Sequence, residues 1–304
     1  MTYIYPQFSE FEIPGVRLAG PGLGNLMLIY FRAWLVAKER GYAFIWPTWP
    51  SIKPGAYLRR EKDKRFYADL FRNRSGYIDG LKKQRLIRRR DAVTVNARAY
   101  DYSRIGGDSV ILYKYFHMDF EDLVPHVDEI REEIVRNLSR KSRRGLEGDM
   151  SRCVNIHVRL GDFAVNTNAL NAGRDNMRIE IGWYAAIVRK LKDILGESVA
   201  FNVFSDGSDE ELGELLAIPG VRRVFYGNSL ADILALSRAP LMVASGSSFS
   251  LWARFLGQCS SISYPNQIKD HVLKPGSDGF EIECAQDAEL PDAAKDTIRR
   301  LYAR

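Results

Sequence analysis

Apolar and polar residues follow two periods along the second half of the chain. Short runs rich in Val, Ile and Phe, typical of strands, alternate with longer segments whose apolar residues recur every three or four positions, typical of helices. Strands are predicted at 152–158, 199–204, 221–226, 240–244 and 260–264, and helices at 180–195, 209–217, 229–237 and 250–257. This alternation with short connections favours a parallel sheet covered by helices on both faces.

The first half shows fewer periodic segments. An apolar helical pattern runs from Leu26 to Gly41, and a short strand at 42–46 follows it. Further along, the pattern predicts a strand at 110–113 and an amphipathic helix at 126–144. The fold class indicated is therefore α/β.

Length and composition fit two globular domains. The chain has 304 residues, of which 46% are hydrophobic and 27% charged. The stretch 139–149 is charged and interrupted by glycine, which places a boundary near 145–151. We predict an N-terminal α/β domain over 1–148 and a C-terminal Rossmann-like domain over 149–304.

Several protein classes are disfavoured by the same composition. The sequence contains no run of 18 apolar residues, so no membrane-spanning helix is expected. Residues 1–12 lack the pattern of a signal peptide. The three cysteines are far apart and lie in no zinc-like cluster, so neither a disulfide framework nor a structural metal is expected. A cytoplasmic protein fits these features.

Basic residues gather in the irregular stretch 47–104. Lys82, Lys83 and Arg88–Arg90 belong to this group, and aromatic residues such as Phe66 and Tyr77 lie between its members. The pattern can bind single-stranded nucleic acid, line a cleft for an anionic or sugar ligand, or form a solvated face. We favour the solvated face. The net charge of +6 favours anionic partners without requiring one.

Three predicted strands of the second half end in polar residues. His157 and Arg159 lie two positions apart, which puts them on one face of a strand, and Asp206 ends the next strand. A serine-glycine turn then enters a helix at Ser247, Ser248 and Phe249, where backbone N–H groups can hold an anion. Because ligands bind at the carboxyl ends of parallel strands, these segments together predict a nucleotide-diphosphate site.

Each of these signals has a structural alternative. An isolated His and Arg on a strand can be a buried ring beside an exposed cation. Asp206 can cap the helix at 209–217, and Ser247 or Ser248 can cap the helix that follows. A glycine-rich loop ending in Gly24 and Asn25 precedes another helix, where it is either an anion site or an ordinary turn.

The motifs that these residues form resemble those of GDP-fucose-dependent fucosyltransferases, most closely the alpha-1,2-fucosyltransferase family. The resemblance runs from about residue 20 to 265. It rests on Gly22–Asn25, His157–Asp162, Phe204–Asp206 and Ser247–Trp252, in the family's order and spacing. The Tyr184 region also resembles the helix after the family's H-x-R-x-G-D loop.

The resemblance implies a GT-B-like α/β fold, in which two Rossmann-like domains face each other across a cleft. It implies that the N-terminal domain lies on the acceptor side and that the C-terminal domain binds the nucleotide sugar. The activity implied is inverting transfer of fucose from GDP-fucose to a glycan hydroxyl, expected to be the 2-OH of a galactoside, with no metal and no cofactor. The partners implied are the donor and an oligosaccharide or glycolipid acceptor, with no nucleic acid.

Residue roles are also implied by position. Arg159 would hold the β-phosphate and the leaving oxygen, His157 would shape that pocket, and Asp206 would face the nucleoside. Ser247, Ser248 and Phe249 would bind the diphosphate and the base region, and Gly24 and Asn25 would close the site. The catalytic base is left open among Asp162, Asp175 and Glu180, and Asp162 is nearest to the motif.

Three positions depart from the family pattern, namely Leu26, Leu160 and Arg254. They leave a related GT-B transferase with another nucleotide sugar as an alternative, and a basic nucleic-acid-binding protein as one of another class. A glycolipid acceptor would bring a cytoplasmic protein to the inner face of a membrane as a peripheral protein. The oligomeric state stays open.

Overall fold

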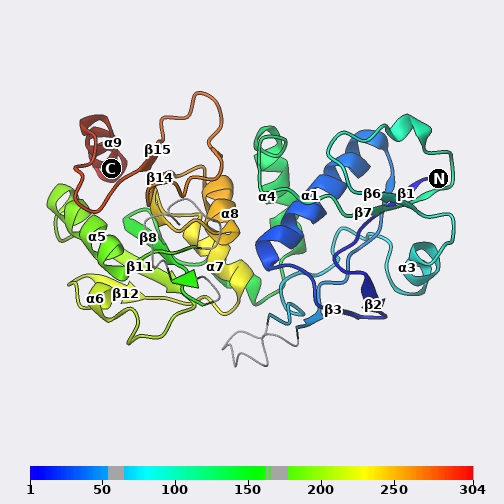
Figure 1. Cartoon of the computed structure of the whole chain (residues 1–304), viewed down its shortest axis with the longest axis horizontal. Coiled ribbons are helices and arrows are strands. Elements are labelled where there is room, and N and C mark those ends of the chain that lie inside the picture. Colours follow the sequence, from blue (N-terminus) through cyan, green and yellow to red (C-terminus); the bar gives the residue numbers. More distant parts are fainter. Residues whose placement is uncertain (54–64, 162–163, 166–176, 304) are drawn as a thin grey trace. The chain divides into compact units, whose positions relative to one another are not determined.

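The computed structural model describes residues 1–53, 65–161, 164–165 and 177–303. Its contacts divide the chain into two compact units (Figure 1). Unit 1 comprises Met1–Met118 and Asp128–Ser139, and unit 2 comprises Asp119–Val127 and Arg140–Arg304. The division follows contacts alone, so the domains expected over 1–148 and 149–304 stay a prediction.

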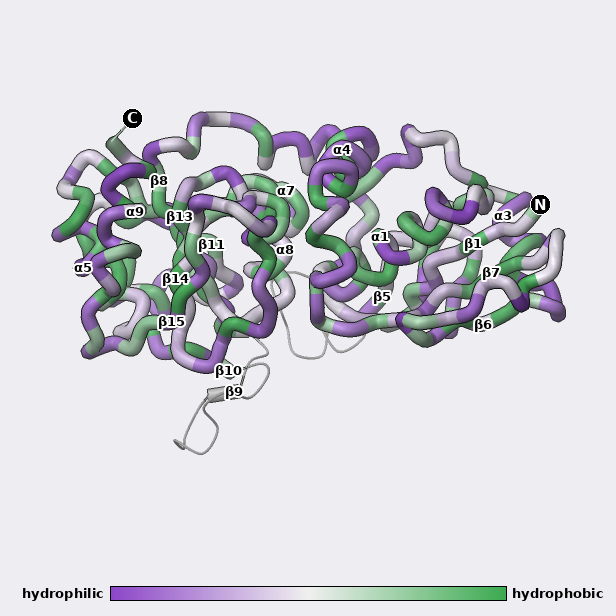
Figure 2. Tube along the Cα trace, turned by 90° about the horizontal axis from the view of Figure 1, so that it is seen from above, coloured by the Kyte–Doolittle hydropathy of each residue, from purple (hydrophilic) through white to green (hydrophobic). Residues whose placement is uncertain are grey.

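A six-stranded parallel sheet forms the centre of unit 2, in the order β12-β11-β8-β13-β14-β15. Its strands are β8 (Cys153–Val158), β11 (Ala200–Ser205), β12 (Val221–Arg223), β13 (Leu241–Ala244), β14 (Ser260–Ser263) and β15 (Glu281–Glu283). All residues of β8 and β13 are buried, as expected for strands covered on both faces. The apolar run of β13 is green in Figure 2.

Helices cover both faces of this sheet (Figure 1). They are α5 (Ile181–Leu195), α6 (Gly213–Leu216), α7 (Ser229–Leu236), α8 (Ser248–Gly257) and α9 (Asp292–Tyr302). Helix α5 packs with α6 and α9, whereas α7 packs with α8. Short 3-10 turns, η2 (Val124–His126) and η3 (Ser142–Leu146), and a small sheet of β9 (Ala164–Val165) and β10 (Met177–Arg178) complete the unit. The predicted parallel sheet with helices on both faces is confirmed.

Unit 1 has its own parallel sheet, in the order β4-β1-β7-β6. The strands are β1 (Tyr3–Pro6), β4 (Ala43–Phe44), β6 (Val93–Val95) and β7 (Val110–Tyr113). The helices are α1 (Leu23–Arg40), α3 (Gly80–Ile87), α4 (Val127–Asn137) and the 3-10 turn η1 (Tyr102–Arg104). A second sheet joins β2 (Phe11–Ile13), β3 (Val16–Leu18) and β5 (Ser51–Ile52). Gly41 ends α1 in the left-handed conformation, with φ 66°.

Two predicted helices are shorter than expected. The helix predicted at 126–144 ends at Asn137, because the carbonyl of Asn137 accepts from the Arg72 N–H at 2.7 Å and Leu138 forms a bridge with Phe71. The helix predicted at 209–217 is reduced to α6, because turns occupy the residues before it. In both places, contacts with distant segments override the local apolar pattern.

Candidate active site

The ends of three adjacent strands bring the predicted polar residues of unit 2 to one edge of the sheet. Strand β8 lies between β11 and β13, and His157 is in register with Phe204, two residues before Asp206. On the other side, Ile156 is in register with Val243, just before the serine-glycine turn that starts at Ser245. As predicted from the sequence, these polar residues therefore lie close together at the carboxyl ends of β11, β8 and β13.

His157 is held by serine hydroxyls. Its Nδ1 lies 2.6 Å from the Ser250 Oγ, 2.9 Å from the Ser245 Oγ and 3.4 Å from the Ser247 Oγ. The Phe249 ring stacks on the imidazole, with centroids 4.7 Å apart and planes 16° from parallel. His157 therefore joins the end of β8 to the first turn of α8.

The charge state of His157 follows from its surroundings. The ring is 5% exposed, and burial together with the nearby Arg159 cation lowers its pKa from 6.5 to about 3. The imidazole is thus neutral near pH 7, and its Nδ1 already has hydroxyl partners. It can fix the shape of the turn, whereas the low pKa makes it a poor proton acceptor.

Arg159 and Asp206 form an ion pair at the same edge. The Arg159 Nη1 lies 2.5 Å from the Asp206 Oδ2, and the two side chains are 22% and 28% exposed. Asp206 also accepts from the Leu160 N–H at 2.9 Å and from the Gly161 N–H at 3.1 Å. One carboxylate thereby orients the guanidinium and fixes the backbone that follows β8.

Gly161 is required by this arrangement. A Cβ at position 161 would lie 2.4 Å from the Asp206 Oδ2, which is shorter than any real contact. The alternative function of Asp206 as a helix cap is not observed. Ser208 and Glu211 bond reciprocally in the turn before α6, where the Glu211 N–H donates to the Ser208 Oγ and the Ser208 N–H donates to the Glu211 Oε2. The N-cap of α6 is Leu212, which makes no side-chain cap bond.

The serine-glycine turn forms the N-terminus of α8. Ser247 is its N-cap and accepts from the Ser250 N–H at 3.4 Å, so the predicted capping function is present. Ser248 and Phe249 are the first two helical residues, and no acidic side chain occupies this turn. The positive end of the helix dipole and its N–H groups remain suited to an anion.

Two buried polar residues beside this edge were not predicted as site residues. Gln267 follows β14, is 2% exposed, and its Oε1 would lie 2.0 Å from a Cβ at Gly246. Tyr184 is 1% exposed, and burial and the Asp206 charge raise its pKa. Within the described residues, neither the Gln267 Oε1 nor the Tyr184 hydroxyl has a hydrogen-bond partner. The strand-end rule could have indicated Gln267, because it comes shortly after a parallel strand.

Other predicted residues lie elsewhere. Gly24 and Asn25 belong to unit 1, in the first turn of α1, where the N-cap Gly22 offers no side-chain bond. The Asn25 Oδ1 is buried, with no partner among the described residues. Asp162 and Asp175 lie outside the described residues, and Glu180 is exposed at the N-cap of α5. The functions expected for all of these stay predictions.

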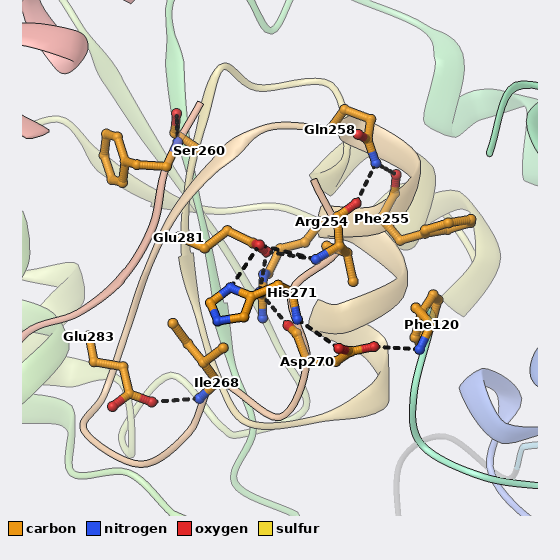
Figure 3. A network of polar contacts seen from close by, with 12 residues as sticks. Phe120, Arg254, Phe255, Gln258, Ser260, Ile268, Asp270, His271, Glu281 and Glu283 are labelled. Atoms are coloured by element: carbon orange, nitrogen blue, oxygen red, sulfur yellow. Dashed lines mark hydrogen bonds and ion pairs between the residues drawn. The ribbon is translucent and has the colours of Figure 1, made fainter. Parts of the chain in front are cut away.

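The three departures from the family pattern have structural explanations. Leu26 and Leu160 are buried apolar residues, 0% and 1% exposed. Arg254 is 2% exposed and forms a buried ion pair with Glu281, and its Nη2 donates to the Asp270 carbonyl at 3.0 Å (Figure 3). The Glu281 carboxylate also accepts from the Val272 N–H at 3.1 Å. Arg254 therefore joins α8 to the segment before β15.

Within the described part of the chain, no cluster of three or more His, Cys, Asp or Glu side chains could hold a metal ion. Likewise, no described helix is both long and apolar enough to cross a membrane. Cys153, Cys259 and Cys284 are buried and form no disulfide.

Comparisons with known proteins show the family and the fold of the chain. The family model of glycosyl transferase family 11 matches residues 95–283. A variant of Arabidopsis thaliana FUT1 in complex with GDP has 14% sequence identity and a TM-score of 0.53, with 87% of this chain and 70% of that chain covered. This likeness confirms the GT-B-like α/β fold class that the sequence predicts.

Two further solved structures are similar over most of the chain. The NodZ alpha-1,6-fucosyltransferase, co-crystallized with GDP and known from Bradyrhizobium, has 13% identity and a TM-score of 0.46, with 87% and 95% of the two chains covered. POFUT1 in complex with GDP has 12% identity and a TM-score of 0.46, with 86% and 98% covered. The comparison with curated protein sequences found no match.

Proposed function

The chain belongs to glycosyl transferase family 11, a family of fucosyltransferases, and on this premise we propose that it transfers fucose from GDP-fucose to a glycan hydroxyl. The membership confirms the predicted enzyme class, a glycosyltransferase. GDP-fucose as the donor is supported by the similar structures, since FUT1, NodZ and POFUT1 are described in complex with GDP. NodZ is further described after soaking with GDP-fucose.

The observation that carries the proposal is the position of the Arg159 guanidinium at the strand-end edge of unit 2. Cleavage of a glycosyl-phosphate bond leaves negative charge on the departing GDP. Arg159, oriented by Asp206, and the N–H groups at the start of α8 are cationic or partly positive groups of the kind that stabilise such charge without reorganisation. In our proposal they replace a metal ion, so no cofactor takes part.

The other residues position the donor. Ser248 and the N-cap Ser247 would bind diphosphate oxygens, and Phe249, stacked on the neutral His157, would support the base region. Inversion at the anomeric carbon needs a base that removes the acceptor proton on the side opposite to GDP. Asp162 is the first candidate by position, with Asp175 and Glu180 as the others, and the low pKa of His157 disfavours His157 itself.

The acceptor belongs to the same proposal. We expect the 2-OH of a galactoside within an oligosaccharide or a glycolipid, in a cytoplasmic protein that contacts the inner face of a membrane peripherally. The acceptor is expected from the sequence resemblance to alpha-1,2-fucosyltransferases, and the cytoplasmic location from the three scattered cysteines.

Transfer from GDP-fucose to a panel of β-galactosides tests the activity. Arg159→Ala should lower kcat by about 10²–10³-fold, the usual loss when one donor to a developing anion is removed. Arg189→Ala is the matched control, because Arg189 is also ion-paired, to Glu214 at 3.6 Å, but lies on α5. Equal activity of the wild type and Arg159→Ala would contradict the assignment of Arg159.

The finer parts of the proposal need separate measurements. The first-formed product should have the anomeric configuration opposite to that of the donor, and activity should persist in EDTA. GDP should raise the melting temperature more than UDP, because a ligand that binds only the folded state stabilises it. Stabilisation by UDP alone would instead support another nucleotide sugar.

A further inference from the structure

Helix α3 of unit 1 and the residues just after it carry basic side chains that no carboxylate of the described residues neutralises. Residues 80–90 contain six Lys or Arg and no Asp or Glu. Two of these cations are accounted for by the fold. Lys83 is buried 3.1 Å from the Glu12 Oε1, and Arg89 pairs with Asp91 at 2.6 Å and with Asp108 at 3.3 Å.

The remaining four cations are Lys82, Arg85, Arg88 and Arg90. All four are exposed, and none pairs with a carboxylate of the described residues. Lys82 only approaches the Tyr3 ring, 6.0 Å from its centroid. A cluster of cations with no internal partner is a surface suited to an anionic one.

The helix presents these residues outward. Leu86 and Ile87 pack against the cluster of Tyr5, Ile45 and Val110, so this side of α3 faces the interior of unit 1. Lys82 and Arg85 are three positions apart, so they are neighbours on the helix, and both are exposed. Helix α3 is drawn at the periphery of unit 1 (Figure 1). Leu81 lies beside them and is 79% exposed, more than any other large apolar side chain described.

We propose that this surface, formed by Leu81, Lys82, Arg85, Arg88 and Arg90 and here called the α3 surface, docks unit 1 on an anionic lipid bilayer. Clusters of Lys and Arg bind anionic headgroups, and an exposed leucine among them can enter the apolar boundary below those headgroups. The basic excess of the chain also lies in unit 1, whose segments contain 23 Lys or Arg against 14 Asp or Glu, while unit 2 contains 21 against 24.

Single-stranded nucleic acid is the other anionic partner that the sequence suggested, and the structure disfavours it. Such partners stack their bases on exposed aromatic rings. Tyr67 and Phe71 are buried, and the Tyr77 hydroxyl donates to the Glu133 Oε1 at 2.9 Å. Among the described aromatic residues of 47–104, only Phe66 is exposed, at 48%. Within the described residues, the basic surface thus offers no platform of several exposed rings and has an exposed aliphatic side chain, Leu81, instead.

Co-sedimentation of the full chain with lipid vesicles tests the proposal. Vesicles of phosphatidylcholine with about one third phosphatidylglycerol should bind the protein in 0.1 M salt, whereas pure phosphatidylcholine should not. Each cation near the surface contributes about fivefold to partitioning, so Lys82→Gln/Arg85→Gln should weaken binding about 25-fold. Salt at 1 M should release the protein, because screening then acts within about 3 Å.

The matched control is Arg299→Gln/Arg300→Gln, which removes two exposed cations from a helix of unit 2. It should change binding less than twofold. Leu81→Ser should weaken binding severalfold at unchanged net charge. Both double variants should keep the wild-type melting temperature, since none of the four side chains is buried.

Three results would overturn the proposal. They are absence of binding to anionic vesicles at low salt, an equal loss in both double variants, and tighter binding of single-stranded RNA than of vesicles through the same residues. The inference deepens the membrane contact in the proposed function, but its test reads lipid binding and not sugar transfer. Failure here with intact fucosyl transfer to a soluble acceptor would leave the proposed activity standing.

Discussion

The buried state of His157 predicts a pH dependence of stability that one substitution should remove. The folded-state pKa is about 3, whereas an unfolded histidine titrates near 6.5. Between these two values the unfolded chain binds a proton that the folded chain does not. The free energy of unfolding therefore rises with pH in this window. The stabilising contribution of the neutral His157 ring is fully present above about pH 6.5 and is lost as the pH falls toward 3.

The magnitude follows from the two pKa values. A pH of 5 is about 1.5 units below the pKa of the unfolded histidine, so that ring is protonated, while the folded ring is still neutral. At about 1.4 kcal/mol per unit, the contribution to the free energy of unfolding falls by about 2 kcal/mol between pH 7.5 and pH 5. His157→Asn removes the titration, yet retains a polar group near the Ser245 and Ser250 hydroxyls.

Urea unfolding at the two pH values measures this difference. Wild-type protein should lose about 2 kcal/mol more than His157→Asn on going from pH 7.5 to pH 5. Circular dichroism follows the transitions, and each unit is fitted separately where two transitions occur. The control is His117→Asn, which replaces an exposed histidine by asparagine. It measures how the substitution itself changes the free energy of unfolding. Equal losses in wild type and His157→Asn would refute the inference that the folded ring stays neutral.

Two further predictions concern glycine packing and the buried ion pair. Gly161→Ala places a Cβ against the Asp206 carboxylate and should disturb its ion pair with Arg159. We expect kcat to fall at least tenfold, with little loss of stability. The control is Gly213→Ala, which should leave kcat unchanged because the added Cβ has open space around it. Normal kinetics of Gly161→Ala would contradict the positioning by Asp206. Arg254→Met leaves Glu281 buried without its cation and should reduce the free energy of unfolding by about 3–5 kcal/mol. Adding Glu281→Gln to Arg254→Met should restore part of that loss in urea unfolding, and a further loss equal to the single effect would contradict the pairing.

The parallel sheet of unit 2 was readable from the sequence because its strands are buried on both faces. Such strands are nearly continuous apolar runs, and β8 and β13 lie within a residue or two of their predicted ranges. The sheet of unit 1 was less visible. Strand β1 was missed, since Tyr3–Pro6 is four residues long and ends in proline, and its pairing with β7 depends on residues more than a hundred positions away.

The candidate site was predictable as far as strand ends and turn residues determine it. His157, Arg159, Asp206 and the α8 turn were expected at one edge and are found there. Their mutual contacts were not predictable, because they depend on side-chain directions that spacing does not give. Gln267 was missed for a related reason, since its proximity to Gly246 arises only when β14 lies beside β13.

Asp206 orients Arg159 and, in the proposed function, also binds the nucleoside. The number of hydrogen bonds that its carboxylate can accept shows that the two functions are compatible. A carboxylate offers about four acceptor positions. Three are occupied by donors from Arg159, Leu160 and Gly161. One position therefore remains, enough for a single hydroxyl or N–H of the nucleoside in the proposed function. Because the same carboxylate orients the guanidinium, binding of the nucleoside and stabilisation of the leaving diphosphate would depend on one rigid group, and a change at Asp206 should weaken both together.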